Sequence, residues 1–211
     1  MKRWGSVAIP LLVCLVLLDA VVRQFVADRA FRRANKPIEE YEKNSVLFLR
    51  GERKRPAFDA SVGPFLRKAV RVEPRCPAYR NYLGRYFSAR ATDPSLSDTQ
   101  RMDLAKQAIE EYERAAELDP LNGVYWAYLA YMQGVMARYY EALARDPSLP
   151  DDQRMVLMRQ ATEEDVNAVT NFVKAVRLNR SNEWIWQVYD GYREWSAPAE
   201  EVPEASATPE P

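Results

Sequence analysis

Histidine is absent from all 211 residues of this chain. Its absence removes the commonest general base and metal ligand, and with them every histidine-activated serine or cysteine nucleophile. Only Cys14 and Cys76 occur, and Cys14 lies in an apolar run, so neither an internal disulfide nor a thiolate metal site is expected. The chain also lacks a glycine-rich phosphate loop and any metal-ligand spacing.

These absences predict no catalytic residue, no cofactor, no metal and no small-molecule substrate, so we expect a protein that is not an enzyme. An enzyme would need two carboxylates that face each other in a cleft.

Net charge is also missing, because 30 basic residues balance 30 acidic ones. A neutral chain does not attract a polyanion, so nucleic acid is not an expected partner.

A long apolar run lies near the start of the chain. Residues 4–22 read WGSVAIPLLVCLVLLDAVV and carry one charge, Asp19. About 20 apolar residues let a helix cross a membrane, so we expect a single-pass anchor, with a juxtamembrane helix, over residues 1–36. A cleaved signal peptide is the alternative, but its apolar region is about 7–15 residues long.

The orientation of this anchor is predicted differently by two rules. The basic residues after the run outnumber those before it, which places the body in the cytoplasm. The short basic start resembles a bacterial signal-anchor, which exports the C-terminal part of its chain. We favour export, and thus an extracytoplasmic body on the bacterial inner membrane.

The middle of the chain carries helical repeats. Pro74, Pro120 and Arg180 each precede by nine residues the pairs Leu83-Gly84, Leu129-Ala130 and Tyr189-Asp190. Six residues after the same three points lie Arg80, Trp126 and Trp186. Ala108, Tyr112 and Ala115, followed by Pro120, recur as Ala168, Phe172 and Ala175.

This arrangement resembles the tetratricopeptide repeat (TPR), whose pattern is W-x2-L-G-x2-Y followed by A-x3-F and P. The resemblance covers residues 58–195. It implies an all-α body, a right-handed solenoid of helical hairpins, which we expect over residues 37–196. Pro37 suits the first turn of a helix and is expected to begin the first one. It also implies that Leu83, Tyr112, Trp126 and Phe172 are buried in one seam.

A second repeat lies between the hairpin helices. DPSLSDTQRMDLAKQA at residues 93–108 matches DPSLPDDQRMVLMRQA at residues 146–161, with an offset of 53. We expect Ser95 and Ser148 to open capping boxes, while an acidic ion-binding loop is the alternative interpretation. The offsets on either side of the loop predict that both helices of the second hairpin are longer by seven residues, about 10 Å.

In TPR proteins the first helix of each hairpin lines a concave face that binds peptides. The resemblance therefore places a protein-binding surface on such helices, and Tyr139 and Tyr140 in the extended hairpin should form an exposed contact surface. The candidate protein-binding residues are Asn81, Arg85, Ser88, Tyr131, Arg138, Tyr139, Tyr140, Trp184 and Gln187. Tyr131 and Trp184 have packing as an equal alternative.

Residues 197–211 form an acidic tail rich in proline and alanine, with four Glu and no basic residue, which predicts disorder. The tail could contact the basic loop at residues 53–55. The sequence as a whole predicts a membrane-tethered scaffold that binds a protein partner in a bacterial envelope assembly. A fixed structural subunit of a larger membrane complex is the alternative.

Overall fold

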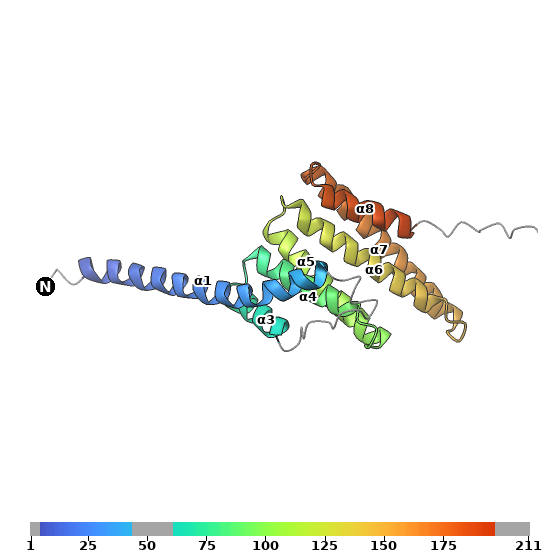
Figure 1. Ribbon diagram of the computed structural model, residues 1–211, viewed down its shortest axis with the longest axis horizontal. Helices are drawn as coiled ribbons and strands as arrows, with labels where there is room; N and C mark the ends of the chain where they lie inside the picture. The colour runs from blue at the N-terminus through green and yellow to red at the C-terminus, as the bar shows by residue number, and fades with distance from the viewer. Residues whose placement is uncertain (1–4, 44–60, 197–211) are drawn as a thin grey trace, which may run out of the picture.

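The computed structural model of the protein describes residues 5–43 and 61–196, and this part of the chain is all helical (Figure 1). The predicted tail at residues 197–211 and the basic loop at residues 53–55 lie outside it. No strand occurs among the described residues. The helices are α1 (Gly5–Lys43), α3 (Gly63–Val72), α4 (Pro77–Ala91), α5 (Asp98–Leu118), α6 (Gly123–Ala144), α7 (Asp151–Leu178) and α8 (Glu183–Ser196).

Helix α1 runs without a break through Pro37, so the prediction that Pro37 begins a new helix is wrong. Its C-terminal half packs on the body through Ala27, Ala30, Ala34 and Ile38, all buried and spaced by three or four residues. This spacing places them on one helix face. Burial of this face holds the helix together where proline removes one backbone hydrogen bond.

The N-terminal half of α1 projects away from the body (Figure 1). Its large apolar side chains from Leu12 to Phe25 are exposed. Among the residues whose side chains are described, no helix is both long and apolar enough to span a bilayer. The predicted anchor at residues 4–22 begins outside that set, because side chains are described only from Leu12 onward.

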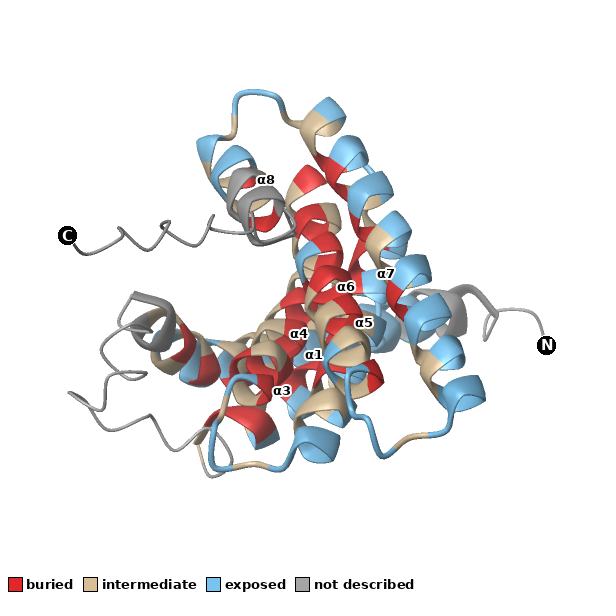
Figure 2. Cartoon of the chain, turned by 90° about the vertical axis from the view of Figure 1, so that its right-hand side faces the viewer, coloured by how far each residue is buried: buried red, intermediate tan, exposed pale blue. Residues whose placement is uncertain are grey.

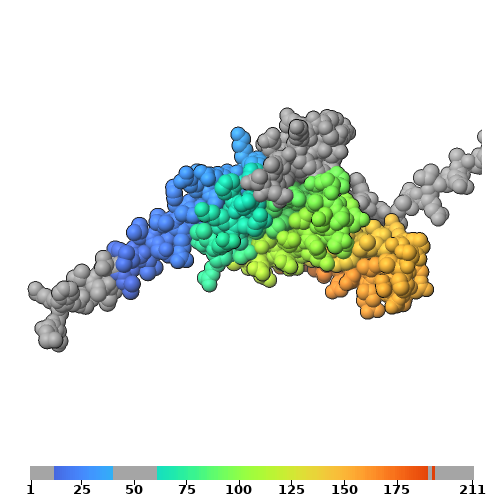
Figure 3. All heavy atoms as spheres, turned by 90° about the horizontal axis from the view of Figure 1, so that it is seen from below, coloured from blue at the N-terminus to red at the C-terminus, as the bar shows by residue number. Residues whose placement is uncertain are grey.

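The body contains two long helical hairpins, α4–α5 and α6–α7. Helices α4 and α5 have 15 and 21 residues, whereas α6 and α7 have 22 and 28. Each helix of the second hairpin is therefore longer by seven residues, as the offsets predict. The tip of the longer hairpin, yellow and orange in Figure 3, stands at the end of the molecule away from α1.

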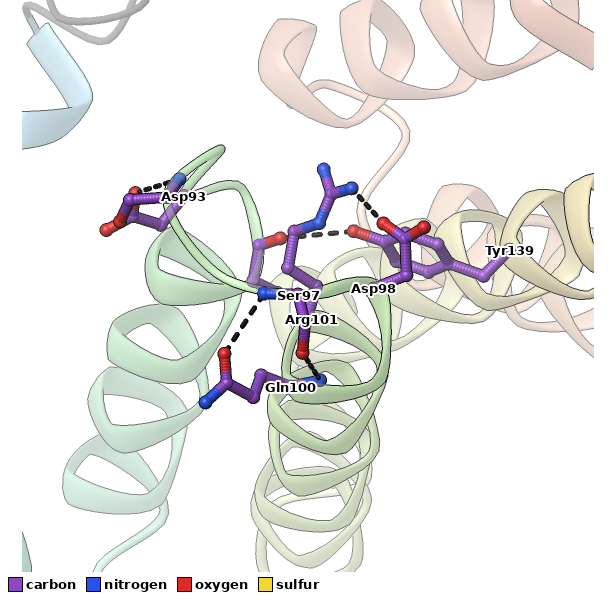
Figure 4. Close-up of polar contacts among 8 residues, drawn as sticks. Asp93, Ser97, Asp98, Gln100, Arg101 and Tyr139 are labelled. Carbon is purple, nitrogen blue, oxygen red and sulfur yellow. Dashed lines mark hydrogen bonds and ion pairs between the residues drawn. The ribbon is translucent and has the colours of Figure 1, made fainter.

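The loops that close the hairpins differ from the predicted capping boxes. The N-cap of α5 is Ser97, which accepts from the Gln100 backbone while Gln100 Oε1 accepts from the Ser97 backbone (Figure 4). Ser95 instead donates to Asp93 at 2.7 Å. In the second copy Pro150 occupies the N-cap position of α7 and makes no side-chain cap, because proline has no hydroxyl.

The turns between hairpins repeat one hydrogen bond. Trp126 Nε1 donates to the Pro120 carbonyl at 3.0 Å, and Trp186 Nε1 donates to the Arg180 carbonyl at 2.9 Å. In the first turn, Arg80 Nε donates to the Pro74 carbonyl at 3.3 Å. Arg80 can replace tryptophan here because its Nε–H supplies the same donor six residues after the turn. The three-cycle register predicted from spacing is thus present in the backbone turns.

One core cluster runs through α1, α3, α4, α5 and α6, and a separate one lies between α6, α7 and α8 (Figure 2). Leu83, Tyr112 and Phe172 are buried, but Phe172 belongs to the second cluster, so the predicted single seam is divided. Trp126 is only half-buried, which corrects its predicted place in the seam. Its indole packs at the edge of the core, where Lys174 Nζ lies 3.2 Å from the ring centroid. Gly84 leaves room for Tyr112, since a Cβ on Gly84 would lie 2.7 Å from the tyrosine ring.

Candidate protein-binding surface

A row of rings crosses four helices on one side of the body. We call it the aromatic row; it comprises Phe31 of α1, Tyr82 and Arg85 of α4, Tyr128 of α6 and Trp184 of α8. All five side chains are half-buried, so each keeps one part in solvent. In Figure 2, helices α4 and α6 lie between α8 above and α3 below. The row therefore connects α4 and α6, the first helices of the two hairpins, with α1 and α8.

Each neighbour in the row contacts the next. The Phe31 and Tyr82 rings meet edge to face with centroids 4.7 Å apart. The Arg85 guanidinium lies 4.2 Å from the Tyr82 centroid and 5.7 Å from the Tyr128 centroid. The ring centroids of Tyr128 and Trp184 are 4.6 Å apart. Such contacts stabilise ring orientation and prepare flat apolar surfaces for a ligand.

Local structure fixes the position of these side chains. Tyr82 and Arg85 are three residues apart and therefore lie on one face of α4. Tyr128 is held from behind by Tyr112 of α5, with which it stacks at 5.3 Å. Trp184 lies in the first turn of α8, where its backbone N–H donates to Asn182 Oδ1 at 3.1 Å.

Asn81 lies next to this row on α4 and is buried. Its Oδ1 has no hydrogen-bond partner among the described residues. A buried acceptor without a partner costs free energy, and native proteins leave few of them.

The remaining candidates on these helices have different environments. Ser88 donates to the Met132 sulfur at 3.0 Å, so its hydroxyl joins α4 to α6. Tyr131 is exposed on α6, three residues after Tyr128 and hence on the same face. Gln187 is exposed on α8, three residues after Trp184. Asn81, Arg85, Tyr131, Trp184 and Gln187 thus belong to or border the row.

Tyr139 and Tyr140 do not form the expected exposed surface, and the candidate Arg138 is held by carboxylates. Arg138 pairs with Glu141 at 2.6 Å and with Asp165 at 3.4 Å, which ties α6 to α7. Tyr139 donates to the Ala91 carbonyl at 3.1 Å, and Tyr140 is half-buried against the core.

The reason is that the extended hairpin still contacts its neighbour. The Tyr139 hydroxyl reaches the C-terminal end of α4, and its ring lies 5.9 Å from the Arg101 guanidinium of α5 (Figure 4). The two added turns of α6 therefore pass beside the first hairpin. Their tyrosines are therefore half-buried against the core and not fully exposed.

Two glutamates on neighbouring helices have a raised pKa. The pKa of the half-buried Glu164 on α7 is raised by burial first, then by the charges of Glu163 and Glu113. The pKa of Glu113 on α5 is raised by partial burial of its carboxyl group and by the charges of Glu117 and Glu110. In the same part of the chain, no group of three or more Cys, Asp or Glu side chains is arranged to hold a metal ion.

Three of the five row residues were not among the candidates from the sequence. Phe31 lies in the segment predicted as a juxtamembrane helix, and neither Tyr82 nor Tyr128 was singled out as a binding residue. A signal was present: Tyr82 and Tyr128 hold equivalent positions in their hairpins, one residue before Leu83 and Leu129.

Comparison of the chain with protein-family models, curated proteins and solved structures gives no match.

Proposed function

We propose that this protein is a TPR-like, membrane-tethered scaffold that binds an extended segment of a partner protein along the aromatic row. The observation that carries the proposal is the row itself, in which half-exposed rings and one guanidinium connect α1, α4, α6 and α8. Aromatic and arginine side chains are those that dominate binding energy at protein interfaces. Grooves lined by aromatic rings also suit an extended backbone.

The chemistry of the row defines the segment that it fits. Apolar or proline side chains would pack on Tyr82, Tyr128 and Trp184, because proline-rich segments bind grooves lined with aromatic residues. A carboxylate of the segment would pair with Arg85, whose guanidinium favours such partners. The partner segment is therefore extended, apolar or proline-containing, and carries an acidic group.

The tether in this proposal is the apolar run at residues 4–22. The exposed apolar side chains from Leu12 onward on α1 support a bilayer contact, because a row of such side chains in water is unfavourable. Helix α1 continues directly into the body through Ala34 and Ile38. The scaffold would thus hold its partner close to the membrane, on the extracytoplasmic side of a bacterial inner membrane.

Substitution of two tryptophans in α8 tests the proposal. Trp184→Ala removes a ring of the row, whereas Trp186→Ala removes a ring of the same helix that lies outside it. Partner proteins would be captured by cross-linking on native membranes carrying the full chain and quantified by mass spectrometry. We expect capture to fall about tenfold or more for Trp184→Ala, a size typical of an interface hot spot.

Trp186→Ala should retain capture, and far-UV circular dichroism with thermal unfolding must show that both variants fold. Equal capture by both variants would contradict the proposed site. Arg85→Glu provides the second arm, because it keeps the helix and reverses the charge offered to an acidic segment. Unchanged capture by Arg85→Glu would also contradict the proposed site, because Arg85 lies at the centre of the aromatic row.

A further inference from the structure

Helix α7 carries an apolar surface that no described element covers. We call it the α7 stripe; it comprises Met155, Met158, Thr162, Val166, Val169 and Val173. These residues recur every three or four positions, which places them on one face of the helix. The five apolar side chains are 39–66% exposed. The stripe covers about 27 Å at 1.5 Å per residue, and it lies on the second helix of its hairpin, away from the aromatic row.

The spacing of the α7 stripe is symmetric about a point near residue 164. Met155 and Val173 lie at equal distances from this point along the chain, and so do Thr162 and Val166. A helix with this spacing matches a second copy of itself in antiparallel orientation, because a two-fold axis through the midpoint pairs each position with its symmetric counterpart.

One pair of charges near the ends of α7 follows the same symmetry with opposite sign. Residues 151–164 of α7 contain four acidic and two basic residues, whereas residues 165–178 contain one acidic and two basic residues. Asp152 and Arg177 are nearly symmetric about the same midpoint and lie along the same edge of the stripe. An antiparallel pair would bring Asp152 of each copy beside Arg177 of the other. A parallel pair would place like charges together.

The surface shape at the two ends is also complementary. At the C-terminal end, α7 and α8 form a groove of about 440 Å³, lined by Val173, Val176, Trp186 and two other aromatic residues, with Arg177 and Arg180 also at its wall. At the N-terminal end Met155 protrudes and is 66% exposed. Antiparallel pairing places Met155 of one copy at the groove of the other. A flexible thioether is suited to fill such a groove and to contact the indole.

We infer that two copies of this protein associate through their α7 stripes, antiparallel, with each Met155 in the α7–α8 groove of its partner copy. The interface is isologous, so each copy supplies one protruding end and one groove. The aromatic rows remain uncovered on the other face of both copies. A dimer would therefore present two partner-binding surfaces.

Cross-linking of the full chain in its membranes tests this geometry. Val166→Cys, in a Cys14→Ser and Cys76→Ser background, places a thiol close to the two-fold axis. Asn167→Cys is the matched control, since Asn167 is exposed on the same turn but lies off the stripe. A short bismaleimide should join two Val166→Cys copies at least about fivefold more than two Asn167→Cys copies. Equal yields, or no dimer, would overturn the inference.

Charge exchange tests the antiparallel arrangement and the predicted pairing of Asp152 with Arg177 of the other copy. Added to the Val166→Cys background, Asp152→Arg makes both ends of the stripe basic and Arg177→Asp makes both acidic, so each variant alone should lose dimer at least about fivefold. Both residues are exposed, so the fold should be retained. Co-expression with different tags should restore a mixed dimer. The proposed pairing would be contradicted if the cross-linking yield of the co-expressed variants were no higher than that of either variant alone.

Discussion

At the scale of single residues, different side chains donate the same hydrogen bond in the three turns that precede α4, α6 and α8. Trp126, Trp186 and Arg80 each direct an N–H to the carbonyl six residues earlier. Arg80 also pairs with Glu111 of α5 at 2.9 Å, so it adds a bond that tryptophan cannot make. The spacing in the sequence predicted that these three positions are equivalent. The hydrogen bond that they share could not be predicted from spacing and is seen only in the structure.

Trp126→Phe tests this bond. The change keeps an aromatic ring for Lys174 and removes the N–H that reaches Pro120. We expect a loss of about 1 kcal/mol in the free energy of unfolding, a typical net value for one hydrogen bond. Trp184→Phe is the control, because the indole N–H of Trp184 has no hydrogen bond among the described residues. Chemical denaturation of both variants gives the comparison, and equal losses would contradict the role assigned to Trp126.

Tyr79 provides a pH-dependent link between α1 and α4. Its hydroxyl donates to Asp28 Oδ1 at 3.2 Å. Burial, followed by the negative charge of Asp28, raises the pKa of Tyr79 to about 12. The pKa of an unfolded tyrosine is about 10, so the folded state holds the proton more tightly. The stability that depends on this proton is fully present below about pH 10 and is lost as pH rises toward about 12.

Tyr79→Phe isolates this effect, because phenylalanine cannot ionise. We expect the stability advantage of the native chain over Tyr79→Phe to decrease as pH rises from about 10 to 12. Urea unfolding at a series of pH values, followed by circular dichroism, measures the difference. An advantage that stayed constant across that range would show that Tyr79 does not retain its proton in the fold.

At the scale of the elements, α5 and α7 begin differently although their loops are copies. Ser97 caps α5 through a reciprocal pair of bonds with Gln100, whereas Pro150 begins α7 without a side-chain cap. Ser97→Ala should therefore lower the free energy of unfolding by about 1 kcal/mol. Ser95→Ala, in the same loop, should change it by less than about 0.5 kcal/mol. Thermal or urea unfolding that ranked Ser95 above Ser97 would contradict this assignment.

Much of the element pattern could be predicted from the sequence. The constant offsets predicted the seven-residue extension of α6 and α7, because helix length depends on local spacing. The predicted N-cap, Ser95, lies two residues before the actual one, Ser97, since two serines in one loop offer the same local signal. The continuation of α1 through Pro37 depends on packing of Ala34 and Ile38, which no local pattern contains. Contacts between distant helices, such as Tyr128 with Trp184, were likewise beyond reach.

At the scale of the whole molecule, two surfaces have different roles in this account. The aromatic row lies on the first helices of the hairpins, and the α7 stripe lies on a second helix. Packing between hairpins supports both surfaces, because Tyr112 lies behind Tyr128 and Phe172 contacts Tyr189 and Tyr192 of α8. A binding event on the row and association through the stripe can therefore occur on the same molecule.

The most direct measurement of the central claim is photo-cross-linking from single positions on the full chain in native membranes. A photoreactive residue at Tyr131 or at Gln187 borders the aromatic row, while one at the exposed Gln107 of α5 lies outside it. We expect the first two positions to label the same partner segment, and Arg85→Glu to reduce that labelling about tenfold. Labelling of that segment from Gln107 alone, or labelling from Tyr131 and Gln187 that is unaffected by Arg85→Glu, would contradict the account.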